Sequence, residues 1–326
     1  MTLRSNSSVS PIRSGSLPEI PGGFVDLQIN GGWGHHFARN PEAIWAVGER
    51  LPRFGVTAFC PTLTSEGVAV WDRAFAVRAT GAPAGYRGAR PIGWHVEGPF
   101  LAPARAGAHD RSVLRPLTPE AVAPLRADRG VRLVTLAPDA APSEAAAHEA
   151  IEALVEAGVT VSLGHTDIDS DAAQRAFAAG ATMGTHLFNA MGGLHHRTPG
   201  LAAALLGDRC DAAVGLIADG HHVAPEVVRL SWRLAAERIV LVSDAISWIG
   251  ERDEPVGTLP DGTLAGATVG IDTGVRNLAR FAGISIAEAA AAASARPAAV
   301  IGYIPPDGDV TVIDDDGIVV ETRIGC

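Results

Sequence analysis

The feature that most constrains the fold is a regular alternation of short apolar runs with alanine-rich segments of helical spacing. Val, Ile and Leu dominate the runs, and Pro, Ser or Asp opens several of the helical segments. Such alternation is typical of β/α units that build a parallel sheet. The predicted strands are 24–29, 57–62, 92–97, 132–137, 160–164, 182–187, 212–218 and 239–243. The predicted helices include 41–54, 66–78, 143–157, 171–179, 225–237 and 286–300.

Eight such units in 326 residues predict a (β/α)8 barrel of class α/β rather than an open, doubly wound sheet. We place the barrel at residues 23–303, after an N-terminal segment, 1–22, that is rich in Ser, Pro and Arg and that we expect to be loose. In the last stretch, 304–326, apolar and polar residues alternate on both sides of an Asp-Gly pair, which indicates a β-hairpin.

Charge and cysteine content exclude several classes of protein. A net charge of −10 opposes non-specific binding to nucleic acid or acidic lipid. All 26 basic residues are arginines, so no lysine nucleophile or Schiff base is available. The three cysteines form no C-x-x-C pair, so neither a disulfide framework nor a cysteine zinc site is indicated. Since no signal-like or membrane-spanning apolar run occurs, we expect a cytoplasmic protein that binds neither membrane nor nucleic acid.

Polar residues gather where the predicted strands end, which is where such barrels build active sites. His95 and Glu97 project to one face of the third strand, His165 ends the fifth, His186 ends the sixth and Asp244 ends the eighth. Each has a structural alternative: a hydrogen-bonded core histidine, a loop-capping glutamate, or a helix N-cap for Asp244. Together, one carboxylate and two imidazoles form the ligand set of a hydrolytic metal site, with Asp244 placed to accept a proton from water.

An ordered series of motifs makes the chain resemble the N-acetylglucosamine-6-phosphate deacetylases of the amidohydrolase superfamily. The resemblance runs from about Gly23 to Ile301. The motifs are "GFVDLQING", "CPTLTS", "HVEGPF", "AGAH", "TLAPD", "GHTD", "THLFNAM", "RTPGL", "IADGHHV", "LVSDA" and "GVRNLA".

The resemblance implies that Glu97, His165 and His186 bind one divalent metal ion, usually zinc or iron. It also implies that Asp244 is first the general base and then the general acid. A metal lowers the pKa of bound water, so that metal-bound hydroxide is available as the nucleophile at neutral pH. Asp244 would deprotonate that water and return the proton to the departing amine.

Gln28 and Asn30 stand where many amidohydrolases have two histidines at the end of the first strand. Neutral amides are much poorer ligands than imidazole for such a metal, so we expect a single metal ion. We expect Gln28, Asn30 and His95 to surround and support the ligand set. A plain hydrogen-bond network at the strand ends is the alternative for Gln28 and Asn30.

Substrate contacts follow from the same resemblance. His109 is expected near the acetyl group or the sugar, while Asn189, Ala190, Arg197 and His222 contact the sugar and its phosphate. A guanidinium suits a phosphate dianion because it donates two parallel hydrogen bonds. An ordinary surface arginine is the alternative for Arg197.

The chain departs from the family pattern at two places. Only about 22 residues precede Gly23 and only a hairpin follows the last helix, so the small β-sandwich of the family must be reduced or missing. The loop after Asp244 is also short, which leaves the sugar less determined than the reaction.

The resemblance implies deacetylation of N-acetylglucosamine 6-phosphate to glucosamine 6-phosphate and acetate, by a homodimer with phosphate contacts across the interface. Two alternatives stay open: a deacetylase of a related N-acetylamino sugar, and a catalytically inert barrel that binds a sugar phosphate.

Overall fold

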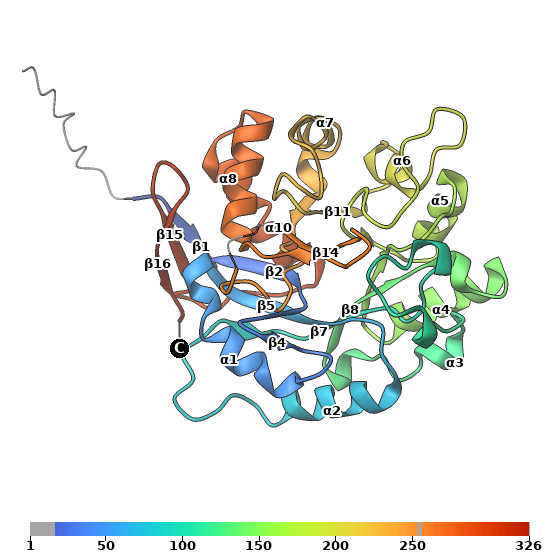
Figure 1. Ribbon diagram of the computed structural model, residues 1–326, viewed down its shortest axis with the longest axis horizontal. Helices are drawn as coiled ribbons and strands as arrows, with labels where there is room; N and C mark the ends of the chain where they lie inside the picture. Colours follow the sequence, from blue (N-terminus) through green and yellow to red (C-terminus); the bar gives the residue numbers. More distant parts are fainter. Residues whose placement is uncertain (1–16, 253, 255, 326) are drawn as a thin grey trace, which may run out of the picture.

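A ring of eight parallel strands forms the centre of the protein, and helices surround it (Figure 1). The computed structural model describes residues 17–252, 254 and 256–325. The strands follow one another around the ring in the order β2-β5-β7-β8-β9-β10-β11-β12. They are β2 (Phe24–Ile29), β5 (Val56–Leu63), β7 (Trp94–Glu97), β8 (Val131–Leu136), β9 (Thr160–Leu163), β10 (Met183–Gly184), β11 (Ala213–Leu216) and β12 (Ile239–Leu241).

The ring closes between β2 and the chain that follows β12. Asp244 N donates to Gln28 O at 2.9 Å and Asn30 N donates to Ala245 O at 2.7 Å. The buried carboxylate of Asp26 accepts from the backbone N–H groups of Gln28 and Ser243 at the same seam. The predicted (β/α)8 barrel is therefore confirmed.

The helices form where the sequence supplies a start signal and an apolar face. In α4 the Ser143 hydroxyl caps the first turn by accepting from Ala146 N, and Ile151 and Leu154 bury one side. The helices are α1 (Ile44–Gly48), α2 (Val68–Ala79), α3 (Pro119–Val122), α4 (Glu144–Glu156), α5 (Ser170–Ala178), α6 (Leu201–Leu206), α7 (Pro225–Ala235), α8 (Ile271–Ala282), α9 (Ile286–Ala291) and α10 (Ala295–Val300).

Three predicted elements were wrong in extent. The single helix expected over 286–300 is two short helices, α9 and α10, because Pro297 has no N–H with which to extend a helix arriving from α9. The helix expected over 41–54 is three short pieces, with Pro52 in the last. The strand expected over 182–187 ends at Gly184, since His186 already has a left-handed backbone conformation.

The barrel interior is divided into two halves. Its lower half is an apolar cluster that includes Val25, Leu27, Leu133, Met183 and Val240. Above it, towards the C-terminal ends of the strands, the inward side chains become polar. This change of side-chain type along the same strands places the functional groups at the C-terminal mouth of the barrel.

A small antiparallel sheet lies beside the barrel, at the left of Figure 1. Strand β15 (Val310–Ile313) pairs with β1 (Glu19–Pro21) on one edge and with β16 (Val319–Arg323) on the other. The interpretation of residues 304–326 as the remnant of a β-sandwich stays a prediction. Residues 1–16 of the segment expected to be loose lie outside the described residues, and the division at residues 22 and 303 stays a prediction.

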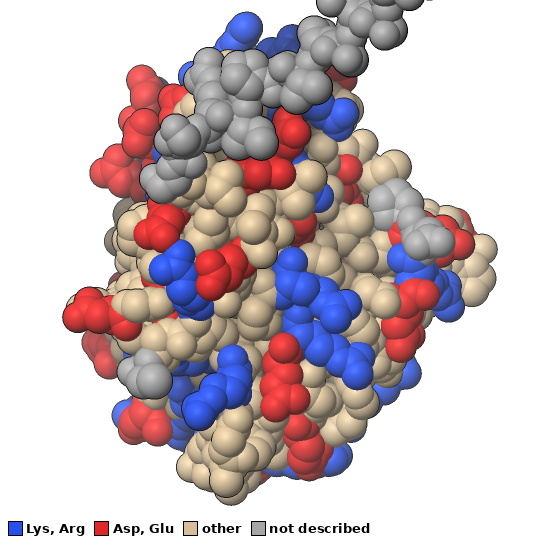
Figure 2. Space-filling model, turned by 90° about the vertical axis from the view of Figure 1, so that its left-hand side faces the viewer, with Lys and Arg blue, Asp and Glu red and all other residues tan. Residues whose placement is uncertain are grey.

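The remaining strands are short. They are β3 (Gly31–Gly32), β4 (His35–His36), β6 (Arg90–Pro91), β13 (Val256–Thr258) and β14 (Leu264–Ala267). The β13–β14 hairpin belongs to the loop after Asp244. Figure 2, the face that carries the small sheet, shows arginines and acidic residues interspersed. Among the described residues, no helix combines the length and apolar character needed to cross a bilayer.

Candidate active site

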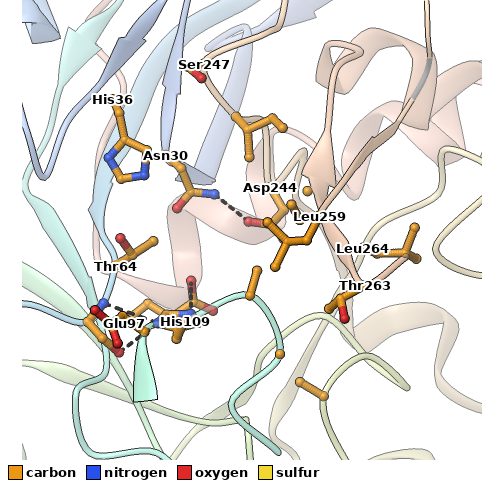
Figure 3. Close-up of a pocket in the computed structure, with 18 of the residues that line it drawn as sticks. Asn30, His36, Thr64, Glu97, His109, Asp244, Ser247, Leu259, Thr263 and Leu264 are labelled. Atoms are coloured by element: carbon orange, nitrogen blue, oxygen red, sulfur yellow. Dashed lines mark hydrogen bonds and ion pairs between the residues drawn. The ribbon is translucent and has the colours of Figure 1, made fainter. Parts of the chain in front are cut away.

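A cavity of about 870 Å³ opens at the C-terminal mouth of the barrel. Most of the residues predicted for the site line it: Asn30, Glu97, His109, His165, His186, Asn189, Ala190, His222 and Asp244. They come from the ends of six different strands, or from the loops that follow them. Chain segments far apart in the sequence thus converge on one space (Figure 3).

Glu97, His165 and His186 form the tightest cluster in this cavity. Glu97 Oε1 lies 3.2 Å from His165 Nε2 and 3.1 Å from His186 Nε2, and the two imidazole nitrogens are 3.1 Å apart. All three side chains are buried. Their ligand atoms lie within 4.8 Å of one another, so one metal ion can contact all three.

Three residues that face the cavity have a strained backbone conformation. His165, His186 and Asp244 all have positive φ angles, of 51°, 29° and 50°. L-residues rarely adopt this conformation, and it costs on the order of 1–3 kcal/mol at each position. Each of these residues leaves its strand direction at the point where its side chain turns into the cavity. The strain therefore coincides with the residues whose orientation matters most.

Hydrogen bonding prepares His165 to bind a cation through Nε2. Its Nδ1 lies 2.9 Å from the Arg105 carbonyl oxygen, which only accepts, so Nδ1 carries the hydrogen and Nε2 presents a lone pair. Burial lowers the pKa of His165 to about 4. Burial works to raise the pKa of Glu97, yet its contacts with the imidazoles of His109, His165 and His186 hold it well below its usual value. His165 is thus a neutral imidazole beside the carboxylate anion of Glu97.

His186 lies between two negative groups. Although burial lowers its pKa, its hydrogen bond to Glu97 and the charges of Glu97 and Asp244 raise it above the usual value. The position therefore favours a positive charge. A divalent cation held at Nε2 would supply that charge in place of a proton.

Asp244 faces the cluster from the other side of the cavity and is held through one of its oxygens. Oδ1 accepts from Asn30 Nδ2 at 2.7 Å and from Gln28 Nε2 at 3.1 Å, and Gln28 Nε2 also reaches Glu97 Oε1 at 3.1 Å. Burial and the nearby charge of Glu97 raise the pKa of Asp244 to about 6. Such a carboxylate is suited to exchanging a proton near neutral pH.

His95 lies below the cluster rather than in it. Its Nδ1 donates to Leu27 O at 3.1 Å, and its Nε2 accepts from the Thr135 hydroxyl at 2.8 Å. The network continues through Thr185 to Ser162, with O–O distances of 2.7 and 2.6 Å. It connects strands that carry Glu97, His165 and His186, and so it supports their positions.

His109 enters the cavity from the loop after β7. Its Nε2 is 3.6 Å from Glu97 Oε2, and its Nδ1 accepts from the Ser65 backbone N–H at 3.2 Å. The Ser65 hydroxyl lies 2.7 Å from the same nitrogen. Because a backbone N–H only donates, Nδ1 has no hydrogen and Nε2–H points towards the reaction space.

His222 stands on the opposite side of the cavity with a fixed orientation. Its Nδ1 lies 2.6 Å from Asp219 Oδ2, so the ring carries a hydrogen on Nδ1. Burial works to raise the pKa of Asp219, but hydrogen bonds from His222 and His221 lower it below its usual value. The pairing engages Nδ1 of His222, so Nε2 is the ring nitrogen left for a ligand.

Arg197 does not line the cavity. It is exposed, on the loop before α6, and its Nη1 lies 2.8 Å from His196 Nε2. Within the part of the chain that the structure describes, Arg39 is the arginine that borders the cavity.

Sequence reasoning missed the residues that orient the others. Ser65 fixes His109, and Asp219 fixes His222. His36, Arg39 and Thr64 line the cavity wall without having been predicted to do so. Of these, Asp219 alone carried a local signal, an Asp-Gly turn three residues before His222.

Comparisons with known proteins agree with this geometry. Residues 20–314 match the amidohydrolase family. The chain is 37% identical over 336 residues to the N-acetylglucosamine-6-phosphate deacetylase of Homo sapiens, covering 93% of this chain and 81% of that protein. It is 34% identical over 305 residues to the N-acetylgalactosamine-6-phosphate deacetylase of a Shewanella strain, covering 88% of this chain and 75% of that protein.

One solved structure of this kind contains a sugar phosphate. The D267A mutant of the Mycobacterium smegmatis N-acetyl-D-glucosamine-6-phosphate deacetylase was solved in complex with N-acetyl-D-glucosamine-6-phosphate. It superimposes with a TM-score of 0.84 at 29% identity, covering 99% of this chain and 90% of that chain.

Proposed function

We propose, from the premise that the chain belongs to the amidohydrolase family and to its N-acetylglucosamine-6-phosphate deacetylases, that it hydrolyses N-acetylglucosamine 6-phosphate to glucosamine 6-phosphate and acetate. The observation that carries the proposal is the meeting of Glu97, His165 and His186 in one cavity with the half-buried carboxylate of Asp244. A catalytically inert sugar-phosphate binder would have no use for that carboxylate, whose burial is unfavourable.

The donor set fits one divalent metal ion, and we propose zinc. Two imidazole nitrogens and one carboxylate oxygen are a usual zinc ligand set, and three protein ligands leave a position open for water or substrate. The amide nitrogens of Gln28 and Asn30 donate to carboxylates, and their neutral amide oxygens are much poorer zinc ligands than imidazole. A metal ion held there would polarise the acetyl carbonyl and lower the pKa of a water molecule.

The protein's own residues then move protons and hold the substrate. Asp244 takes the proton of the attacking water and later gives it to the departing sugar nitrogen, which leaves as an amine. Gln28 and Asn30 hold Asp244 through Oδ1, which directs Oδ2 to this exchange. His109, as the Nε2–H form set by Ser65, donates to the carbonyl oxygen as negative charge develops there.

Recognition of the phosphate is assigned to the side of the cavity over β10 and β11. Asn189 and Ala190 lie in the turn after β10, and His222 follows β11. His222, oriented by Asp219, is assigned to contact that phosphate.

A homodimer accounts for the position of Arg197. Its guanidinium is exposed outside its own cavity. In a dimer that brings this loop to the mouth of the second barrel, Arg197 supplies the phosphate with a bidentate partner in trans. We place this enzyme in the cytoplasm, in keeping with its small phosphorylated substrate.

Turnover tests the proposal directly. Purified zinc-loaded protein is incubated with N-acetylglucosamine 6-phosphate or with unphosphorylated N-acetylglucosamine, and acetate is measured. We expect acetate from the phosphorylated sugar at a kcat/KM at least 100-fold higher. Acetate release from neither sugar would sink the proposal.

The contribution of Arg197 is tested with a matched pair of variants. Arg197→Ala is expected to raise KM for the phosphorylated sugar by roughly 10-fold or more, whereas Arg39→Ala leaves that KM within about threefold. A KM effect from Arg39→Ala alone would place the phosphate on the other side of the cavity and remove the argument for a dimer.

A second candidate substrate is N-acetylgalactosamine 6-phosphate, because the Shewanella relative that acts on it is 34% identical over most of this chain. The two sugars differ at a single hydroxyl. A kcat/KM higher for the galactosamine derivative would favour this candidate.

A further inference from the structure

A chain of hydroxyl groups lies in the barrel interior beneath the three proposed metal ligands. It consists of Ser162, Thr185 and Thr135 and ends at the ring of His95, and all four side chains are buried. The successive distances are 2.6, 2.7 and 2.8 Å. These four residues do not line the cavity, so they cannot touch a substrate there. Any part that they have in the reaction must act through other residues.

The hydroxyl chain has a single hydrogen-bond direction, and a backbone carbonyl sets it. His95 Nδ1 lies 3.1 Å from Leu27 O, which only accepts, so Nδ1 carries the hydrogen. The ring is buried, and among the described residues neither nitrogen is hydrogen-bonded to a carboxylate, so the ring is neutral and Nε2 accepts. Thr135 then donates to Nε2, its oxygen accepts from Thr185, and Thr185 accepts from Ser162. Each hydroxyl hydrogen is used once.

Two of the proposed ligands are neighbours of this chain along the backbone. Glu97 on β7 is the register partner of Thr135 on β8, and the N–H of Gly98 donates to Thr135 O at 3.0 Å. His186 directly follows Thr185. A shift of either threonine would therefore move the backbone that carries a ligand.

The third ligand, His165, is connected to the chain by close packing. It follows Gly164, where a Cβ atom would lie 2.8 Å from Thr185 Cβ and 3.0 Å from Thr135 Cγ2. Only a residue without a side chain allows this approach. The backbone before His165 thus rests directly against the two threonines.

Thr135 occupies the central place in this arrangement. Strand β8 lies between β7 and β9 and carries none of the proposed ligands. Through its hydroxyl, however, Thr135 is bonded to His95 on β7 and to Thr185 just after β10. One side chain therefore connects the segments that carry Glu97 and His186.

We propose that Thr135 is a positioning residue for the metal site, and that its hydroxyl fixes the spacing of Glu97, His165 and His186. The inference rests on the metal site of the proposed function. Without this hydroxyl, Nε2 of His95 loses its donor and the hydroxyl of Thr185 loses its acceptor, so the segments that carry the ligands are no longer held together. Outer partners that orient metal ligands typically change metal affinity by about 10–100-fold.

Zinc affinity of the full-length protein tests the inference without any substrate. Zinc is removed, and its Kd is then measured by competition with a chromophoric chelator. Thr135→Val keeps the shape of the side chain without its hydroxyl, and we expect it to raise the zinc Kd by roughly 10-fold or more. Thr135→Ser retains both hydrogen bonds and should stay within about threefold of the wild type.

A spectroscopic measurement reports the ligand geometry itself. Co²⁺ is bound in place of zinc, and its visible absorption depends on the arrangement of its ligands. We expect a changed spectrum in Thr135→Val and the wild-type spectrum in Thr135→Ser.

Thr57→Val is the matched control for a general loss of stability. Thr57 lies on β5, is fully buried, and donates its hydroxyl to Gly22 O at 2.6 Å, away from the cavity. This variant should lose stability but keep its zinc Kd within about twofold of the wild type. An equal rise of the zinc Kd in Thr57→Val and Thr135→Val overturns the inference.

The remaining outcomes separate this inference from the proposed function. A zinc Kd raised more than about threefold in Thr135→Val supports the inference, and a rise of about threefold or less overturns it while leaving the deacetylase function intact. A wild-type protein that binds no zinc overturns the proposed metal site itself. If Thr135→Val fails to fold, Ser162→Ala decides. It removes only the first donor of the hydroxyl chain and should raise the zinc Kd about threefold, and an unchanged Kd overturns the inference.

Discussion

The upper and lower halves of the barrel interior are built from the same strands but by opposite rules. On β8 the inward side chains change from Leu133 to Thr135, and near β12 they change from Val242 to Asp244. The lower half is an apolar cluster, while the upper half holds the buried acid Glu97 and the half-buried acid Asp244. A step of two residues along a strand thus leads from an environment that stabilises the fold to one that destabilises it.

This difference shows which part of the fold is destabilised by the groups that the chemistry requires. The upper half contains buried carboxylates and non-glycine residues with positive φ, among them His165, His186 and Asp244, and each of these features opposes folding. The lower half favours folding by burying apolar area at about 25 cal/mol per Å². Substitutions in the upper half should therefore change activity far more than stability, and substitutions in the lower half the reverse.

The largest effect is expected at the metal ligands. Glu97→Gln removes the only anionic ligand of the set, and His186→Ala removes one of the two imidazoles. We expect each to lose bound zinc and to lower kcat/KM by about 10³-fold or more. Metal content by mass spectrometry and acetate release measure the two effects. His148→Ala, on α4 away from the cavity, is the control; full metal content in both ligand variants would contradict the assignment.

Asp244→Asn should separate catalysis from metal binding. The variant keeps an oxygen to accept from Asn30 but can no longer take up a proton, so we expect retained zinc and a kcat lowered by roughly 10²-fold or more. Because the substitution removes the negative charge of a half-buried carboxylate near Glu97, the free energy of unfolding should not fall. An unchanged kcat would show that another group is the general base.

Leu133→Ala tests the other half of the barrel. Leu133 is 1% exposed within the lower apolar cluster, so the substitution leaves a cavity and should lower the free energy of unfolding by about 2–4 kcal/mol. We expect kcat of the folded enzyme to stay within about threefold. Urea denaturation measures the stability. Val320→Ala, at a position 56% exposed, is the control and should lower the free energy of unfolding by less than about 0.5 kcal/mol. An equal loss of stability in both variants would contradict the stabilising role of the lower apolar cluster.

The smallest effect is a pH dependence at the seam where the ring of strands closes, between β2 and the chain that follows β12. Burial raises the pKa of Asp26 from an ordinary 3.8 to about 7. Between these values the folded chain keeps a proton that the unfolded chain releases, so stability falls as pH rises from about 4 to about 7. Asp26→Asn removes this dependence and keeps an acceptor for Gln28 N and Ser243 N.

Urea denaturation of the metal-free protein at pH 5 and pH 8 measures this dependence. Relative to Asp26→Asn, the wild type should lose about 2 kcal/mol between the two pH values. Asp72→Asn, at an exposed position, should show no such difference. If the free energies of unfolding of the wild type and of Asp26→Asn differ by the same amount at both pH values, Asp26 does not titrate in this range.

Much of the fold followed from local patterns. The run of Val, Ile and Leu at β2 was predicted with its observed bounds, and β8 to within one residue. The predictions that failed were those in which proline or a turning backbone acts within a favourable composition, as at Pro297 and His186. Alanine content favours a helix over 286–300, but composition does not register a missing N–H.

The site, like the fold, could be predicted from the sequence only in part. The convergence of Glu97, His165 and His186 could be predicted, because parallel strands of a barrel end at one mouth. The partners that orient these groups could not. Ser65 and His109 are 44 residues apart, and Asn30 and Asp244 are 214 apart. No sequence period connects them.

By itself, the sequence determined the alternation of strands and helices, and therefore which polar residues stand at strand ends. These are short-range properties, set by side-chain period and by the residues that start and stop helices. Only the tertiary structure decided which nitrogen of each histidine faces the cavity, that Arg197 lies outside it, and that the wall formed by Asn30, His36 and Thr64 is polar. Those outcomes depend on distances of a few ångströms between segments that meet only when the ring of strands closes.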